Sequence, residues 1–261
     1  MTPAGERTPD TGQAEEAYYR ELWASDRWGA GAPNSDEAAR AGRIVELIDS
    51  QVLPALGGKR LRILDLGCGR GWLTAVLASR GEVLGIDPTP AGVARAQELF
   101  PELRFECSGT RELLASRGPG QFDLVVSSEV IEHVPEADQA GFLRDIHALL
   151  AEDGFAILTT PRGELREAWE RAQTELQPVE DWLTGPRLQA LCEGAGFAVR
   201  RASRVFVPVE LETAAYRLLN GRVLRAIMAR WPSFPLARAL RWFCSIYQVV
   251  LLQRVTGQRH V

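Results

Sequence analysis

Short apolar runs alternate with helical patterns between Arg60 and Pro161, and this alternation constrains the fold more than any other feature. Each run is rich in branched or aromatic residues and is bounded by Gly, Pro or Asp, as β-strands are. The runs cover residues 61–66, 82–87, 103–107, 122–127 and 155–160. Near-continuous apolar strands separated by helices predict a parallel sheet with helices on both faces. The predicted fold class is therefore α/β, with an open, doubly wound sheet that binds its ligand at the carboxyl ends of the strands.

Further elements flank this core. Residues 14–24 and 35–55 have helical spacing and predict two helices before it. Ser35 is a suitable N-cap for the second helix, because two acidic residues follow it in the first turn. After the core, the sequence predicts a helix over 184–192 and strands over 197–205 and 247–254.

The segment DLGCGRG (65–71) follows the first predicted strand and opens a helix. Glycines allow the backbone to turn sharply and let a ligand approach without Cβ collisions. Asp87 ends the second strand twenty residues after Gly67, where an acid can bind both hydroxyls of a ribose. This order of strand, glycines, helix, strand and acid predicts a nucleotide site.

Two residues argue against a dinucleotide in this site. The dinucleotide pattern needs a third small residue at position 72, where this chain has Trp72. Asp65 would repel a pyrophosphate, but it suits a ligand with an ammonium and a sulfonium group. S-adenosylmethionine has these two cations, an adenine, a ribose and no phosphate, so it is the predicted cofactor. The structural alternative for Asp65 is a helix-capping or turn residue.

Three segments resemble motifs of the class I S-adenosylmethionine-dependent methyltransferases. These segments are ILDLGCGRGWL (63–73), FDLVVSSEVIEHV (122–134) and LLAEDGFAILTTP (149–161). The second is most similar to ubiquinone-biosynthesis O-methyltransferases and to related enzymes that methylate sugars and polyketides. The resemblance covers residues 40–205. It implies a Rossmann-like, doubly wound sheet of seven strands, mostly parallel with an antiparallel last strand, a role that residues 247–254 fit.

The resemblance also implies roles for individual residues. The implied cofactor-binding residues are Asp65, Gly67, Gly69, Asp87, Ser108 and Ser128. The first three would line the methionine portion, Asp87 would hold the ribose, and Ser128 would use its backbone. The third strand lacks the acid that usually meets the adenine amine, and Ser108 or Thr110 would replace it. Arg40 or Arg43 could pair with the cofactor carboxylate, or both could lie on a solvated helix face.

His133 is the candidate general base, because it follows the fourth strand, where the substrate should lie. Glu132 or Glu129 would orient it. The alternative is that His133 only shapes the cofactor pocket. No metal site is predicted, since the four cysteines stand far apart without a CxxC pair.

The predicted reaction is transfer of a methyl group from S-adenosylmethionine to a hydroxyl of a small molecule. A glycoside, a polyketide or a quinone-type precursor in bacterial secondary metabolism is the expected acceptor. The alternatives are an N- or C-methyltransferase of a small or lipid-like acceptor and a non-catalytic cofactor-binding subunit. Scattered cysteines and a polar, acidic N-terminus predict a cytoplasmic protein.

Charge is distributed unevenly along the chain. The last 49 residues hold eight arginines and no acidic residue, so their net charge is +8 against −12 for the rest. Residues 206–246, which hold most of these arginines, could be a substrate lid or homodimer face, contact an anionic membrane surface, or pack on the acidic core. Nucleic acid is a poor partner for a chain that is otherwise acidic. The predicted divisions are a disordered tail (1–13), an N-terminal helical lid (14–58), a cofactor-binding core (59–205), a helical Arg-rich insert (206–246), and a last strand with its tail (247–261).

Overall fold

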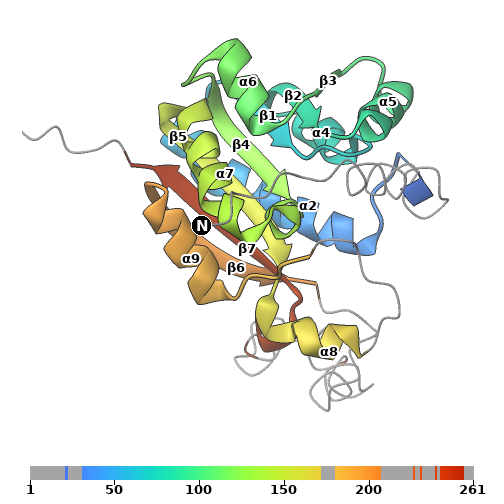
Figure 1. Ribbon diagram of the computed structural model, residues 1–261, viewed down its shortest axis with the longest axis vertical. Helices are drawn as coiled ribbons and strands as arrows, with labels where there is room; N and C mark the ends of the chain where they lie inside the picture. Colours follow the sequence, from blue (N-terminus) through green and yellow to red (C-terminus); the bar gives the residue numbers. More distant parts are fainter. Residues whose placement is uncertain are drawn as a thin grey trace, which may run out of the picture.

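The computed structural model describes residues 21–22, 31–171, 180–206 and 242–255, together with residues 226, 230 and 239. These residues form a seven-stranded sheet in the order β3-β2-β1-β4-β5-β7-β6 (Figure 1). The strands are β1 (Leu61–Leu66), β2 (Gly81–Asp87), β3 (Arg104–Cys107), β4 (Phe122–Ser128), β5 (Leu150–Pro161), β6 (Phe197–Val205) and β7 (Tyr247–Arg254). All neighbours pair in parallel except β7, which is antiparallel to both β5 and β6. The predicted mostly parallel sheet with an antiparallel last strand is confirmed.

Helices lie on both faces of the sheet. The helical segments are α2 (Ser35–Leu47), the π-helical η1 (Ile48–Val52), α3 (Leu53–Ala55), α4 (Trp72–Leu77), α5 (Pro90–Leu99), α6 (Thr110–Arg117), η2 (Ile131–His133), α7 (Glu136–Leu149), η3 (Gly163–Leu165), α8 (Arg166–Glu170) and α9 (Gly185–Gly194). One apolar cluster joins α2, η1 and α4 to the sheet, and a second joins α6, α7 and α9 to it. Successive side chains of a strand point to opposite faces of the sheet. Ile63 of β1 therefore belongs to the first cluster and its neighbour Leu64 to the second.

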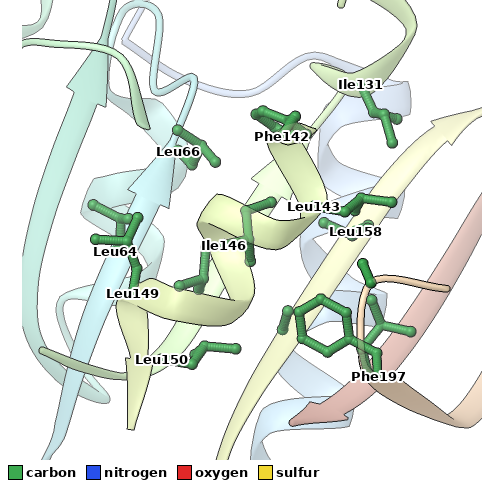
Figure 2. Close-up of a cluster of buried hydrophobic side chains, with 14 of the residues drawn as sticks. Leu64, Leu66, Ile131, Phe142, Leu143, Ile146, Leu149, Leu150, Leu158 and Phe197 are labelled. Atoms are coloured by element: carbon green, nitrogen blue, oxygen red, sulfur yellow. The ribbon is translucent and has the colours of Figure 1, made fainter. Parts of the chain in front are cut away.

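The second cluster shows how helix α7 is anchored. Its residues Phe142, Leu143, Ile146 and Leu149 recur at helical spacing and are buried against the sheet (Figure 2). Burial of each such side chain contributes about 1.5–3 kcal/mol. This packing holds α7 against β5, α6 and α9, and thereby anchors the helix that follows the loop after β4.

Several predicted boundaries need correction. Helix α2 starts at the predicted residue, but its N-cap is Asn34 rather than Ser35. Asn34 Oδ1 accepts from the Glu37 amide at 2.9 Å, and Glu37 Oε2 accepts from the Asn34 amide at 2.8 Å. This reciprocal capping box satisfies two free backbone donors at once, which Ser35 could not do. Strand β5 begins at Leu150 instead of 155, because Leu150 pairs with Phe122 across an irregular register.

Parts of the predicted lid and insert lie outside the described residues. Of the lid, residues 14–20 and 23–30 are not described, and of the insert only residues 206, 226, 230, 239 and 242–246 are. Among the helices that are described, none has the length and apolar character needed to cross a membrane.

Candidate functional site

The loop after β1 approaches the loop after β4 at the carboxyl edge of the sheet. Gly67, Gly69 and Gly71 all have positive φ, at 77°, 49° and 82°. A Cβ on Gly67 would lie 2.3 Å from Val130 Cγ2, a separation that no side chain tolerates. Glycine is therefore required here by its backbone conformation and by the close approach of Val130. The predicted glycine loop and the fourth-strand motif thus meet at one edge.

Asp87 ties this loop to the end of β2. Its Oδ2 accepts from the Gly69 amide at 2.9 Å, and its Oδ1 accepts from the amide and hydroxyl of Thr89 at 2.8 and 2.5 Å. Burial raises the pKa of the Asp87 carboxyl, and the three hydrogen bonds oppose this rise. A carboxylate has about four acceptor positions, so Asp87 keeps capacity for a ribose hydroxyl. Its position fits the predicted role.

Asp65 is buried beneath the loop, with 1% of its surface exposed. Its Oδ2 accepts from the Thr74 hydroxyl at 2.6 Å, in the first turn of α4. Burial raises the pKa of Asp65 to about 7, the Thr74 hydrogen bond opposes this rise, and the Asp87 charge adds to it. The contact with α4 favours the capping alternative for Asp65. Asp65 is also a titratable carboxyl directly below the glycine loop. A cation bound nearby would lower the pKa of this carboxyl and so favour its ionised form.

Ser108 and Thr110 both follow β3, but they have different hydrogen-bond partners. The Ser108 amide donates to the Asp87 carbonyl at 3.1 Å, and its hydroxyl donates to the Gly109 carbonyl. The Thr110 hydroxyl instead donates to Asp145 of α7 at 3.1 Å. Ser108 therefore lies next to the predicted ribose residue, whereas Thr110 is held by α7.

The end of β4 carries backbone strain. Glu129 has φ of 60°, which only a few per cent of non-glycine residues adopt. Its amide donates to the Thr159 carbonyl at 3.0 Å, and its Oε1 accepts from the Thr159 hydroxyl at 2.8 Å. Ser128 bonds the same hydroxyl at 2.8 Å. Strained residues of this kind cluster at functional sites because the surroundings must hold them in place.

Two carboxyl groups with raised pKa values lie here with His133. Burial raises the pKa of Glu129 to about 8, Arg40 opposes this rise, and Glu132 adds to it. Burial likewise raises the pKa of Glu132 to about 8, against a 2.9 Å hydrogen bond from the Thr160 hydroxyl. Glu132 is almost wholly buried, whereas the Glu129 side chain is 20% exposed. His133 is partly buried and interacts electrostatically with Glu129, one of the two glutamates predicted to orient it.

Arg40 belongs to this group, and Arg43 does not. Arg40 is only 5% exposed, so the expectation of a solvated face is wrong for it. It donates to Asp36 at 2.8 Å, and its Nε lies 4.0 Å from Glu129 Oε1 with no hydrogen-bond partner among the described residues. Arg43 points toward β6, where it donates to Ser203 at 2.9 Å.

Tyr247 closes the site from the start of β7. The Arg40 guanidinium lies 4.3 Å from the centre of its ring, and its hydroxyl donates to Asp36 Oδ2 at 3.0 Å. Burial raises the pKa of the Tyr247 hydroxyl well above its ordinary value, so the phenol stays neutral. The sequence predicts Tyr247 only as a strand residue, because nothing local to residues 247–254 indicates its contact with α2.

Arg70 and Glu37 form a fully buried ion pair that the sequence does not predict either. Arg70 donates to both Glu37 oxygens, at 2.8 and 2.7 Å. Both side chains are at most 3% exposed. An arginine between two glycines is the one local signal, and it does not identify the partner.

Residues 37–202 match the sequence model of a family described as "Methyltransferase domain". A ubiquinone biosynthesis O-methyltransferase of Pseudomonas aeruginosa (strain LESB58) is 40% identical over 109 residues, covering 40% of this chain and 45% of that protein. The enzyme of the same name from Azorhizobium caulinodans is 34% identical over 170 residues, covering 59% and 66%. The chain thus matches less than two thirds of the length of these curated relatives.

A solved structure shows the same fold. The 1,6-didemethyltoxoflavin-N1-methyltransferase of Burkholderia thailandensis, with bound 1,6-didemethyltoxoflavin and S-adenosylhomocysteine, aligns with a TM-score of 0.53. It is 19% identical, and the alignment covers 98% of this chain and 94% of that one. At this identity the likeness extends to the fold alone.

Proposed function

Since this chain belongs to the methyltransferase-domain family and is a class I S-adenosylmethionine-dependent methyltransferase, we propose that it methylates a hydroxyl oxygen of a small molecule. The acceptor would be a glycoside, a polyketide or a quinone-type precursor in bacterial secondary metabolism. The approach of Gly67 to Val130 carries this proposal, because it joins the glycine loop to the strand end that holds Glu129, Glu132 and His133. The O-methyltransferase relatives support oxygen as the accepting atom.

The cofactor site lies along the ends of β1 to β4 in this proposal. Asp87 would bind the ribose, the loop at Gly67 and Gly69 would line the methionine portion, and Asp65 would supply a negative charge beneath it. Ser108 would approach the adenine, and Ser128 would use its backbone. When bound, S-adenosylmethionine supplies a methyl group that its sulfonium has already activated. Arg40 Nε, which has no hydrogen-bond partner among the described residues, would donate to a carboxylate of the cofactor.

The protein must remove a proton from the acceptor hydroxyl. A phenol has a pKa near ~10, so a general base helps at neutral pH. His133 would accept this proton at the end of β4. Glu129 is the better placed of the two glutamates to orient it, because its side chain is partly exposed and interacts electrostatically with His133, whereas Glu132 is enclosed. The strained backbone at Glu129 would hold this geometry.

Release of S-adenosylhomocysteine tests the function. The protein is incubated with S-adenosylmethionine and a panel of catechols, glycosides and hydroxylated polyketides, and products are identified by mass spectrometry. We expect release that depends on a hydroxyl acceptor, with an O-methyl product. Release only with amine or carbon acceptors would replace O-methylation by the N- or C-methyl alternative. Cofactor binding without release for any acceptor class would favour the non-catalytic subunit.

A further inference from the structure

Arg70 occupies an unusual place for an arginine. It lies inside the glycine loop, between Gly69 and Gly71, and it is among the largest side chains that are fully buried. Burying a guanidinium is unfavourable unless a partner compensates its charge. Both neighbouring glycines have positive φ and little intrinsic conformational preference. One hydrogen bond within the loop, from the Gly71 amide to the Cys68 carbonyl at 2.8 Å, helps to hold its conformation, and contacts from outside the loop supply the rest.

Glu37 of helix α2 supplies one of these contacts. Its two oxygens accept from Arg70 Nη1 and Nη2 in a bidentate pair, the most directional form of ion pair. The same carboxylate also accepts from the Asn34 amide in the capping box. Glu37 thus caps α2 and holds Arg70 with a single group.

Asp87 supplies a second contact, next to the hydrogen bonds that the Gly67 and Cys68 amides donate to the Ile86 carbonyl at 2.8 and 2.9 Å. It holds the Gly69 amide from the end of β2, so the loop is bonded on both sides of the Gly69–Arg70 peptide. Arg70 Nη2 also lies 3.4 Å from the Ala32 carbonyl, which extends the contact to the segment before α2. The loop conformation depends in this way on where the N-terminal end of α2 is docked.

We propose that Glu37 is a positioning residue of the cofactor site, which fixes the backbone of residues 69–71 through Arg70 and thereby couples the docking of α2 to the binding of S-adenosylmethionine. The inference rests on the proposed role of the glycine loop in holding the cofactor. The coupling is reciprocal, so bound cofactor must also stabilise the docked helix.

The direct test measures the binding of S-adenosylhomocysteine by calorimetry. Glu37→Gln keeps the size of the side chain and removes its charge. We expect the Kd to rise by about 5- to 150-fold, the range of ordinary coupling between sites. The melting temperature should fall by about 10 °C, because the Arg70 charge loses its partner.

Asp123→Asn is the matched control. Asp123 is a buried carboxylate near the amino end of the central strand β4, away from the carboxyl ends that carry the proposed site, and it is paired with Lys59 and Arg62 at 2.9 Å each. Its replacement should lower the melting temperature while leaving the Kd within about twofold of the wild type, because distant sites act independently. A comparable loss of affinity in both variants would show that Glu37 acts only through stability, and would overturn the proposal.

A double variant keeps the proposal testable if Glu37→Gln does not fold. Glu37→Met with Arg70→Met replaces the ion pair by apolar groups of similar size, which commonly restores stability. We expect the melting temperature to recover while the Kd stays raised, since apolar contacts do not orient the loop. Recovery of both quantities would overturn the proposal.

Hydrogen exchange supplies a readout of the reciprocal effect. In the wild type, S-adenosylhomocysteine should slow exchange in residues 35–40, and in the double variant this protection should disappear. Unchanged exchange in the wild type despite binding contradicts the coupling. Absence of binding to the wild type would instead contradict the proposed function, so the two failures are distinguishable.

Discussion

At the scale of the residue, glycines with the same φ need not have the same function. Gly67 and Gly57 have φ of 77° and 72°, but only Gly67 has a neighbour in the way of a Cβ. The sequence identified Gly67 as important from its motif. Only the tertiary structure shows that Val130, from the loop after β4, is what excludes a side chain there.

Gly67→Ala should be more destabilising than Gly57→Ala. Gly57→Ala, the control, should lower the free energy of unfolding by about 1–2 kcal/mol, because alanine is unfavourable in a left-handed backbone conformation. Gly67→Ala should lose about 1–3 kcal/mol more, because Val130 Cγ2 lies 2.3 Å from the new Cβ. Urea denaturation of both variants measures the difference. Equal losses would mean that the approach of Val130 does not constrain this site.

His133→Ala tests the proposed general base. If His133 accepts the proton of the acceptor hydroxyl, turnover should fall by ~10²–10⁴, while S-adenosylhomocysteine binds as before. Turnover and calorimetry are measured on the same preparation. A loss of less than about fivefold with intact binding would leave His133 only a role in shaping the pocket.

At the scale of the element, strand type and position were largely predictable. The bounds of β1, β6 and β7 agree with the predicted runs, and in β1 and β7 branched and aromatic residues predominate. The early start of β5 was missed, since the polar residues 151–154 look like a turn and their strand geometry depends on pairing with β4. Local patterns thus predict apolar strands well and predict their polar extensions poorly.

His147, at the junction of α7 and β6, is expected to make the protein less stable in acid. The His147 ring packs edge-on against Phe197 at 5.2 Å, and a Cβ on Gly196 would lie 3.0 Å from its Nε2. Burial lowers the pKa of His147 below its ordinary 6.5, and the nearby Arg254 charge lowers it further. The unfolded chain therefore takes up this proton first, so stability should fall as the pH drops through about 6.5.

His147→Gln isolates this contribution. The variant cannot take up the proton, so its free energy of unfolding should change less than that of the wild type between about pH 7.5 and 5. The comparison at each pH cancels the opposite effect of Glu129 and Glu132, whose raised pKa values favour the folded state in acid. Parallel pH profiles for both proteins would remove His147 as the cause.

At the scale of the whole molecule, the uneven distribution of charge is described by the sequence alone. The basic stretch lies mainly in the insert, of which residues 207–225, 227–229, 231–238 and 240–241 fall outside the described structure. The acidic part contains Asp65 and Asp87 at two strand ends, as a site for a cationic ligand should. The proposals for the insert are a substrate lid or homodimer face, contact with an anionic membrane surface, and packing on the core.

Replacement of four insert arginines distinguishes these proposals. The variant carries Gln at Arg225, Arg230, Arg238 and Arg241. A lid predicts lower turnover, a dimer face a smaller mass by light scattering, and a membrane surface weaker binding to anionic liposomes. The last effect should diminish in high salt. No change in all three measurements would leave packing on the core as the role of the charge.

The sequence by itself determined the sheet, the glycine loop and the identity of the cofactor class. These depend on hydrophobic period, turn residues and short motifs, all of which act within a few neighbouring residues. Only the tertiary structure decided which charged groups meet, such as Arg70 with Glu37, and Arg40 with Tyr247. Many arginines and acids have the same local patterns, so the partners are selected by how α2 packs against α4, β6 and β7, a choice that no single segment encodes.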